Sequence, residues 1–126
     1  MLLDIQQRRI PPDIAVMELT GKLALGRESQ RIETLVDELI AGGGRKAIID
    51  LTKVDYIDSA GIGLLALAAG KLKESGGRLA LIASPDGRVL QMLNMTQVTA
   101  IVTVVPSFTE AEAAVAGAAR ENDATA

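Results

Sequence analysis

The stretch that decides the fold is residues 50–63, DLTKVDYIDSAGIG, where a buried strand is followed by a helix. Residues 47–51 before it are almost all apolar without alternation, which predicts a strand buried on both faces of a parallel sheet. After it, Asp58 and Ser59 are two good N-cap residues in succession, so we expect a helix over residues 60–75. Because α/β sheets place their sites where strands end, this junction is the first place to expect function.

Strands and helices alternate on both sides of this junction. Apolar residues at helical spacing predict a helix over residues 29–41, which the three glycines at 42–44 end. Ser84-Pro85-Asp86 predicts the start of a third helix, and Thr109-Glu110-Ala111-Glu112 has the pattern of a capping box before a fourth. Further strands are predicted at residues 2–6, 14–20, 79–83 and 101–105, the first two joined by a proline-containing turn at 9–13.

The resulting order, β-β-α-β-α-β-α-β-α, predicts a single α/β domain. Its sheet is expected to be mostly parallel, with a hairpin at one edge and helices packed on it. At 126 residues, 48% of them hydrophobic, the chain is long enough to bury a core. We assign residues 1–119 to the domain and residues 120–126 to a frayed C-terminal tail.

The composition argues against several classes of function. A net charge of −3, with one tyrosine, one phenylalanine and no tryptophan, argues against a nucleic-acid partner. No apolar run is long enough to span a bilayer and no secretory signal is evident, so we expect a cytoplasmic protein without direct membrane insertion. The absence of His and Cys removes the usual zinc ligands, the Ser–His dyad and thiol nucleophiles. We therefore predict a protein that is not an enzyme and needs no metal or cofactor.

Ser59 and the residues after it admit two interpretations. In the structural one, Asp58 or Ser59 caps a helix, and the glycines ease packing against the sheet. In the functional one, Ser59 accepts a phosphoryl group, which adds about −1.5 to −2 charges beside Asp58. Each of Gly61 and Gly63 costs the helix about 1 kcal/mol relative to alanine, which close approach by a partner would justify.

Two other motifs in this region are weaker. Residues 61–66, GIGLLA, match the G-x-G-x-x-A dinucleotide pattern, but about nine residues separate them from Leu51, whereas that fingerprint follows its strand directly. Asp50, Asp55 and Asp58 could together hold Mg²⁺, although acids in a loop that leaves a strand are more often solvated.

With the Asp58-Ser59-Ala60-Gly61-Ile62-Gly63 element and this order of elements, the chain resembles the STAS domain family, and within it the bacterial anti-sigma-factor antagonists. The resemblance covers roughly residues 2–116. It is supported further by residues 48–51, IIDL, by the glycines at 76 and 77, and by residues 90–96, LQMLNMT.

The resemblance implies a partner switch. An unphosphorylated domain of this kind binds an anti-sigma factor that is also a serine kinase, and so frees the sigma factor. The kinase then phosphorylates the serine that matches Ser59, binding ends, and a PP2C-type phosphatase reverses the modification. The partner-binding residues it implies are Asp58, Ser59, Ala60, Gly61, Ile62 and Gly63, with Gly21 and Lys22. We expect a monomer or a weak homodimer.

One segment departs from the family pattern. Many antagonists carry glycine-glutamate-hydrophobic-aspartate after the second strand, but this chain has Gly21-Lys22-Leu23-Ala24, which loses both acids and gains a cation. The partner kinase is therefore expected to present a different surface. Two alternatives stay open: a STAS subunit of a transport or stress-signalling assembly that works without phosphorylation, and a nucleotide-binding domain.

Overall fold

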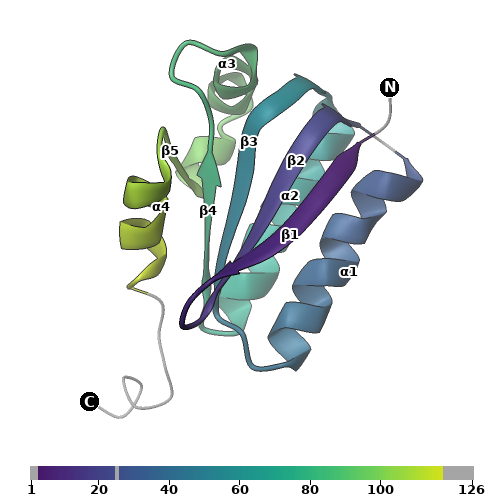
Figure 1. Ribbon diagram of the computed structural model, residues 1–126. Helices are drawn as coiled ribbons and strands as arrows, with labels where there is room; N and C mark the ends of the chain where they lie inside the picture. The colour runs from purple at the N-terminus through teal and green to yellow at the C-terminus, as the bar shows by residue number, and fades with distance from the viewer. Residues whose placement is uncertain (1–2, 25, 118–126) are drawn as a thin grey trace.

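A five-stranded sheet forms the centre of the molecule. The computed structural model describes residues 3–24 and 26–117, with the strands in the order β1-β2-β3-β4-β5 (Figure 1). β1 is antiparallel to β2, and the other neighbours are parallel, which confirms the predicted α/β class with an edge hairpin. The strands are β1 (Asp4–Ile10), β2 (Ile14–Leu23), β3 (Lys46–Ile57), β4 (Arg78–Ile82) and β5 (Thr103–Val105).

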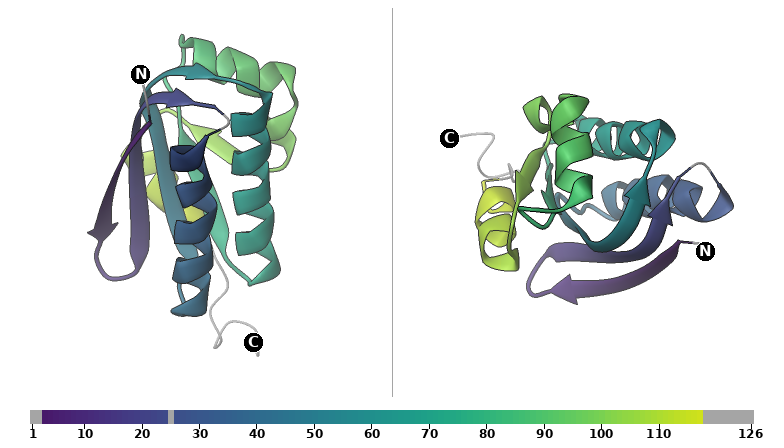
Figure 2. Two further views of the ribbon diagram at one scale, coloured as in Figure 1. Left: turned by 90° about the vertical axis from the view of Figure 1, so that its right-hand side faces the viewer. Right: turned by 90° about the horizontal axis from the view of Figure 1, so that it is seen from above.

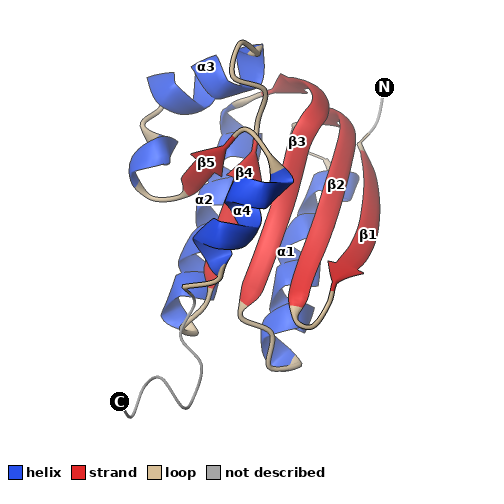
Figure 3. Cartoon of the chain, turned by 60° about the vertical axis from the view of Figure 1, so that its left-hand side comes forward, coloured by secondary structure: helices blue, strands red, loops and turns tan. Residues whose placement is uncertain are grey.

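Helices cover the sheet unequally. α1 and α2 lie side by side on one face, with α3 at the end of the same face, whereas α4 covers the opposite face (Figures 2 and 3). The order of strands and α-helices is the predicted one, with one short 3₁₀ helix added before β5. The helices are α1 (Arg27–Ala41), α2 (Ser59–Glu74), α3 (Arg88–Met95), η1 (Val98–Ala100) and α4 (Phe108–Val115).

The sheet separates two apolar cores. Ile49 of β3 packs in the larger core with Leu65 and Leu72 of α2, and its neighbour Ile48 packs in the smaller core with Val115 of α4. Each of these five side chains is fully buried. The unbroken apolar run at the start of β3 therefore does mark a strand covered on both faces, as predicted.

β3 is longer than predicted. The segment 52–57, expected to be a loop, continues the strand and pairs with the end of β2 through two shifts of register. Val54 and Ile57 are buried, and each is preceded by two exposed residues. Irregular pairing spaces the buried side chains by three rather than two, so the alternation that identifies a strand in sequence is missing.

Both predicted helix starts in the C-terminal half are wrong in position. α3 begins at Arg88 with Gly87 as its N-cap, and Ser84 instead closes a turn in which its carbonyl oxygen accepts a hydrogen bond from the Gly87 amide at 3.0 Å. In α4 the capping residue is Ser107, whose Oγ accepts a bond from the Glu110 amide at 3.2 Å. Ser107 and Glu110 have the same S-x-x-E chemistry as the predicted box, two residues earlier in the chain.

The predicted strand over residues 101–105 is also too long. Residues 98–100 form η1, Ile101 is 62% exposed, and only Thr103–Val105 pair with β4. β5 is an edge strand rather than a buried one, which the apolar composition of this stretch did not reveal. The first strand is likewise shifted, to Asp4–Ile10. The predicted tail at residues 120–126 lies outside the described residues.

Candidate functional site

Asp58 caps α2. Its Oδ1 accepts a hydrogen bond from the Gly61 amide at 2.9 Å, and its own amide donates to the Leu23 carbonyl oxygen at 3.3 Å. The residue thus joins the end of β2 to the start of the helix, in the extended conformation usual for an N-cap. The structural part of the sequence interpretation is therefore correct for Asp58.

Ser59 has a different position. It is the first residue of α2, it is exposed, and within the described part of the chain its side chain makes no hydrogen bond. Because the Asp58 side chain already makes the capping bond to the Gly61 amide, the Ser59 hydroxyl is not needed as a cap. A phosphoryl group on this oxygen would lie at the positive end of the helix dipole, where anions are favoured.

Gly61 and Gly63, the first two glycines of α2, differ in what the fold requires of them. Gly61 is buried, and a Cβ there would overlap the carbonyl oxygen of Leu23. Gly63 is exposed, and apart from its chain neighbours and the backbone of its own helix a Cβ there would have no described atom within 4 Å. Packing against the sheet therefore explains Gly61 and leaves Gly63 without a structural reason.

The exposed side of α2 has little side-chain bulk. Ala60, Gly63, Leu67 and Gly70 recur at helical spacing and are all exposed, Leu67 by 45%. We call these four residues the α2 outer face. It extends from the Ser59 end of the helix, and it is apolar without a charged side chain of its own.

Two further exposed residues lie where β2 and β3 end. Lys22 pairs in register with Tyr56, and its Nζ lies 5.9 Å from the centre of the tyrosine ring. Tyr56 is 50% exposed, an unusual exposure for one of only two aromatic residues in the chain. Gly21 is buried at a φ of 106°, a conformation that favours glycine, so its role is in the strand.

A hollow of about 350 Å³ connects this corner to α3. Ser59 and Tyr56 line it on one side, and Arg88 and Met92 of α3 on the other. Tyr56, Arg88 and Met92 are not among the site residues predicted from the sequence. Tyr56 could have been noticed as a rare aromatic beside the serine, whereas the two α3 residues come close only through the fold.

The predicted site residues therefore divide into two groups. Ser59, Ala60, Gly63 and Lys22 are exposed and available to a partner, and Asp58 is half-buried. The remaining three, Gly21, Gly61 and Ile62, are buried in the domain.

The alternative ligand sites find no support in the geometry. Asp50 Oδ1 accepts hydrogen bonds from the amide and hydroxyl of Thr52 at 2.9 and 2.7 Å, and no three acidic residues in segments 3–24 and 26–117 come together in a way that could hold a metal ion. The Gly61 amide, which a dinucleotide phosphate would need, is bonded to Asp58. None of the described helices has the length and apolar character required to cross a membrane.

The chain is similar to a known protein family and to individual proteins. The model of the STAS domain matches residues 6–111. A candidate anti-sigma factor antagonist of Thermotoga maritima is 26% identical over 103 residues, which cover 82% of this chain and 90% of that protein.

Three solved structures share the fold. The crystal structure of a candidate anti-sigma factor antagonist from Thermotoga maritima superposes with a TM-score of 0.78 at 24% identity, over 89% of this chain and 94% of that one. An anti-sigma factor antagonist from Mycobacterium paratuberculosis gives 0.76 at 18% identity, over 91% and 95%. The Bacillus cell fate determinant SpoIIAA in its phosphorylated form gives 0.67 at 19% identity, over 89% and 99%.

Proposed function

This chain belongs to the STAS domain family, and on that premise we propose that it is an anti-sigma factor antagonist controlled by phosphorylation of Ser59. The unphosphorylated form binds an anti-sigma factor that is also a serine kinase, and a PP2C-type phosphatase restores that form. The protein itself carries out no reaction. The names of its relatives support the antagonist role, and the existence of SpoIIAA in a phosphorylated form supports the switch.

The proposal rests on the different roles of Asp58, which caps the helix, and Ser59, whose side chain makes no described hydrogen bond. Asp58 holds the cap bond, so Ser59 presents a hydroxyl that the fold does not use. A kinase can reach this exposed oxygen without unfolding the helix. Modification of Ser59 would therefore change the surface of the protein while leaving its fold intact.

The α2 outer face supplies the surface that the phosphate would control. A partner backbone can approach Gly63 closely, because no side chain covers it. A phosphate carries about −1.5 to −2 charges, and burying it unpaired beneath a partner costs several kcal/mol. Since about 2.8 kcal/mol already weakens a complex a hundredfold, a single phosphate is sufficient to release the partner.

Lys22 gives the proposed interface its specificity. The acid found here in many antagonists is replaced by an exposed lysine beside Tyr56. A partner that docks across this corner would need a carboxylate opposite Lys22, because like charges across an interface are strongly disfavoured. Lys22→Glu should therefore weaken binding of the natural partner.

The test is a pull-down from lysate of the source organism with wild type, Ser59→Ala and Ser59→Asp as baits. Intact-mass analysis of each bait reports added phosphate. We expect wild type and Ser59→Ala to retain a serine kinase, Ser59→Asp to lose it, and phosphate to appear only on wild type.

Ser84→Asp is the matched control. Ser84 is also an exposed serine in the turn before a helix, so its replacement tests added charge in general, and it should leave binding unchanged. If all baits retain the same proteins and none is modified, the phospho-switch is wrong. The α2 outer face would then belong to a STAS subunit of a constitutive assembly.

A further inference from the structure

β3 contains an extra residue in the stretch that leads toward Ser59. Glu18 of β2 pairs in register with Asp50 of β3, and Thr20 pairs with Lys53. Between these two pairs β2 has one residue and β3 has two, which is the arrangement of a β-bulge.

Burial identifies Thr52 as the extra residue. Alternate side chains of β3 up to Leu51 lie in the larger core, and the next one there is Val54 rather than Lys53. Thr52 and Lys53, which come between them, are both exposed. Without Thr52, strict alternation would bring Val54 to the core directly after Leu51.

Asp50 supplies the hydrogen bonds that this extra residue needs. Its Oδ1 accepts one from the Thr52 amide at 2.9 Å and one from the Thr52 hydroxyl at 2.7 Å. Asp50 is only 9% exposed, so its carboxylate is held close against the strand. Because the extra residue of a bulge is left unpaired by the neighbouring strand, a local side chain takes the place of the missing backbone partner.

The chain after the bulge is aligned on one residue of β2, Leu23. The Asp58 amide donates to the Leu23 carbonyl oxygen at 3.3 Å, and Gly61 fits against the same oxygen because it has no Cβ. A slip of β3 by one residue would displace both contacts by about 3.3 Å. The position of Ser59, between Asp58 and Gly61, therefore depends on the register in which β3 reaches Leu23.

We propose that Asp50 is a positioning residue for Ser59. By holding Thr52 as an extra residue, it fixes the register of β3 and so the place at which the Ser59 hydroxyl is presented. The consequence for phosphorylation rests on the proposed function. The structural step from the Asp50 carboxylate to the start of α2 does not, and it is measured without a partner.

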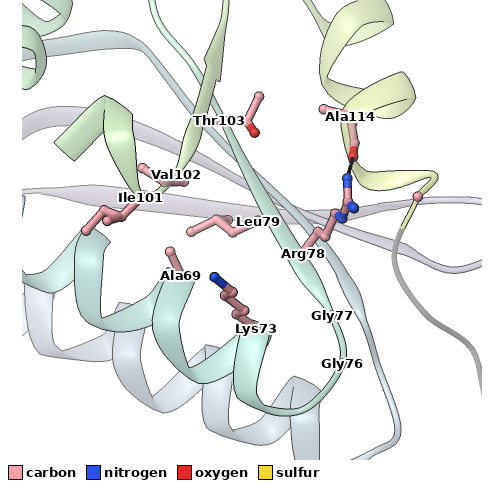
Figure 4. A pocket seen from close by; sticks show the side chains of 11 residues that line it. Ala69, Lys73, Gly76, Gly77, Arg78, Leu79, Ile101, Val102, Thr103 and Ala114 are labelled. Carbon is pink, nitrogen blue, oxygen red and sulfur yellow. Dashed lines mark hydrogen bonds between the residues drawn. The ribbon is translucent and has the colours of Figure 1, made fainter. Parts of the chain in front are cut away.

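The experiment is native-state hydrogen exchange of ¹⁵N-labelled Asp50→Leu, which keeps a side chain of similar size without an acceptor. The amides of Asp58 and Gly61 report on the start of α2. The Arg78 amide, bonded to the Arg45 carbonyl oxygen at 2.8 Å, is the reference, since Arg78 lies beside α4 at the other end of β3 (Figure 4).

We expect Asp50→Leu to lower the protection of the two reporter amides at least about tenfold and that of the Arg78 amide less than about twofold. Equal losses at all three amides would show a general loss of stability and would overturn the proposal. Unchanged protection of the Asp58 and Gly61 amides would overturn it as well.

Two variants separate the acceptor oxygen from the charge. Asp50→Asn keeps an oxygen that accepts both bonds, so its reporter amides should stay within about threefold of wild type. Glu18→Leu is the matched control, because it removes the acid in register with Asp50 on β2 and should leave the reporter amides unchanged. A loss in either variant as large as that in Asp50→Leu would contradict the proposed role.

Deletion of Thr52 completes a double-mutant cycle. The pairs on either side of Thr52 can keep their register without it, so Asp50→Leu should change the reporter amides less than about threefold in this background. A tenfold loss in both backgrounds would show that Asp50 does not act through the bulge. If the deletion variant does not fold, Thr52→Val replaces it: it keeps the amide bond, and a loss as large as that in Asp50→Leu would overturn the proposal.

Phosphorylation provides the functional measurement. With the kinase retained by wild type in the pull-down, Asp50→Leu should gain phosphate at least about tenfold more slowly than Asp50→Asn, in proportion to its loss of protection. Equal rates would overturn the positioning role. If no kinase is retained, the proposed function fails, while the exchange data still decide whether Asp50 fixes the start of α2.

Discussion

At the scale of single residues, the start of α2 separates a structural role from a regulatory one within two adjacent positions. Asp58 bonds to the helix backbone, whereas Ser59 presents an exposed hydroxyl. Sequence alone could not make this distinction, because serine and aspartate are equally good N-caps. Only the position of the first helical residue decides which of them is the cap.

Replacing these two residues by alanine should affect the free energy of unfolding unequally. Asp58→Ala removes the bond to the Gly61 amide and should lower the free energy of unfolding by about 1 kcal/mol. Ser59→Ala should change it by less than about 0.5 kcal/mol, because no described contact depends on the hydroxyl. Urea denaturation of both variants measures the difference. A larger loss for Ser59→Ala would show that the serine is the cap and would weaken the case for a switch.

The two glycines give a second matched pair. Gly61→Ala should destabilise the domain by about 1–3 kcal/mol, because its methyl group would overlap the Leu23 carbonyl oxygen. Gly63→Ala should stabilise it by up to about 1 kcal/mol through better helix propensity. Urea denaturation again reports both values, and equal destabilisation would contradict the structural distinction drawn between them.

At the scale of elements, a three-residue ion cluster joins α1 to α2. Lys71 of α2 lies 2.7 Å from a Glu33 oxygen and 2.9 Å from one of Asp37, both on α1. The hydrogen bond to Glu33, followed by that to Asp37, raises the pKa of Lys71 above its ordinary value of 10.5. Because the folded state holds this proton more tightly than the unfolded chain, the cluster stabilises the fold below pH 10.5.

The direction in which the stabilisation by Lys71 changes with pH is testable. Lys71→Met should lower the melting temperature slightly at pH 8, and the difference from wild type should shrink as the pH rises above 10.5 and the folded-state ammonium loses its proton. Thermal melts from pH 8 to pH 11.5 measure it. Lys73→Met is the control, since this exposed lysine of the same helix forms no described ion pair. A difference that grows with pH would contradict the assignment.

The elements also show what sequence patterns can and cannot predict here. The order of strands and helices followed from apolar spacing, because each helix buries one side and each central strand both. The end of β3 did not follow, because irregular pairing with β2 removes the alternation. The start of α3 was misplaced because Ser84-Pro85-Asp86 is equally suited to a turn. Arg88 and Met92 could not be associated with Ser59, since only tertiary packing brings them to one hollow.

At the scale of the whole molecule, both edges of the sheet are poorly suited to pairing with another copy. β1 presents four consecutive exposed polar residues at positions 6–9, and β5 has only three residues. Charged and very short edge strands discourage association between sheets.

We therefore expect a monomer near 13.2 kDa in solution. Size-exclusion chromatography with light scattering, at several concentrations, measures the mass. A stable mass of twice this value would contradict the expectation and would point to association through the α2 outer face. Leu67→Glu, which places a charge on that face, would then restore the monomer.

The order of the strands has a consequence for how the protein is made. Every strand pairs with the one that precedes it in the chain, so no strand has to be inserted between two that are already paired. During synthesis the sheet can grow from β1 in the direction in which the chain emerges, and each parallel strand joins the one before it after a single crossover of about 20 residues. β2, β3 and α2, which hold Ser59 and the corner around it, emerge before the strands and helices that complete the C-terminal half. The segment that carries the proposed switch is thus among the first parts of the molecule able to assemble.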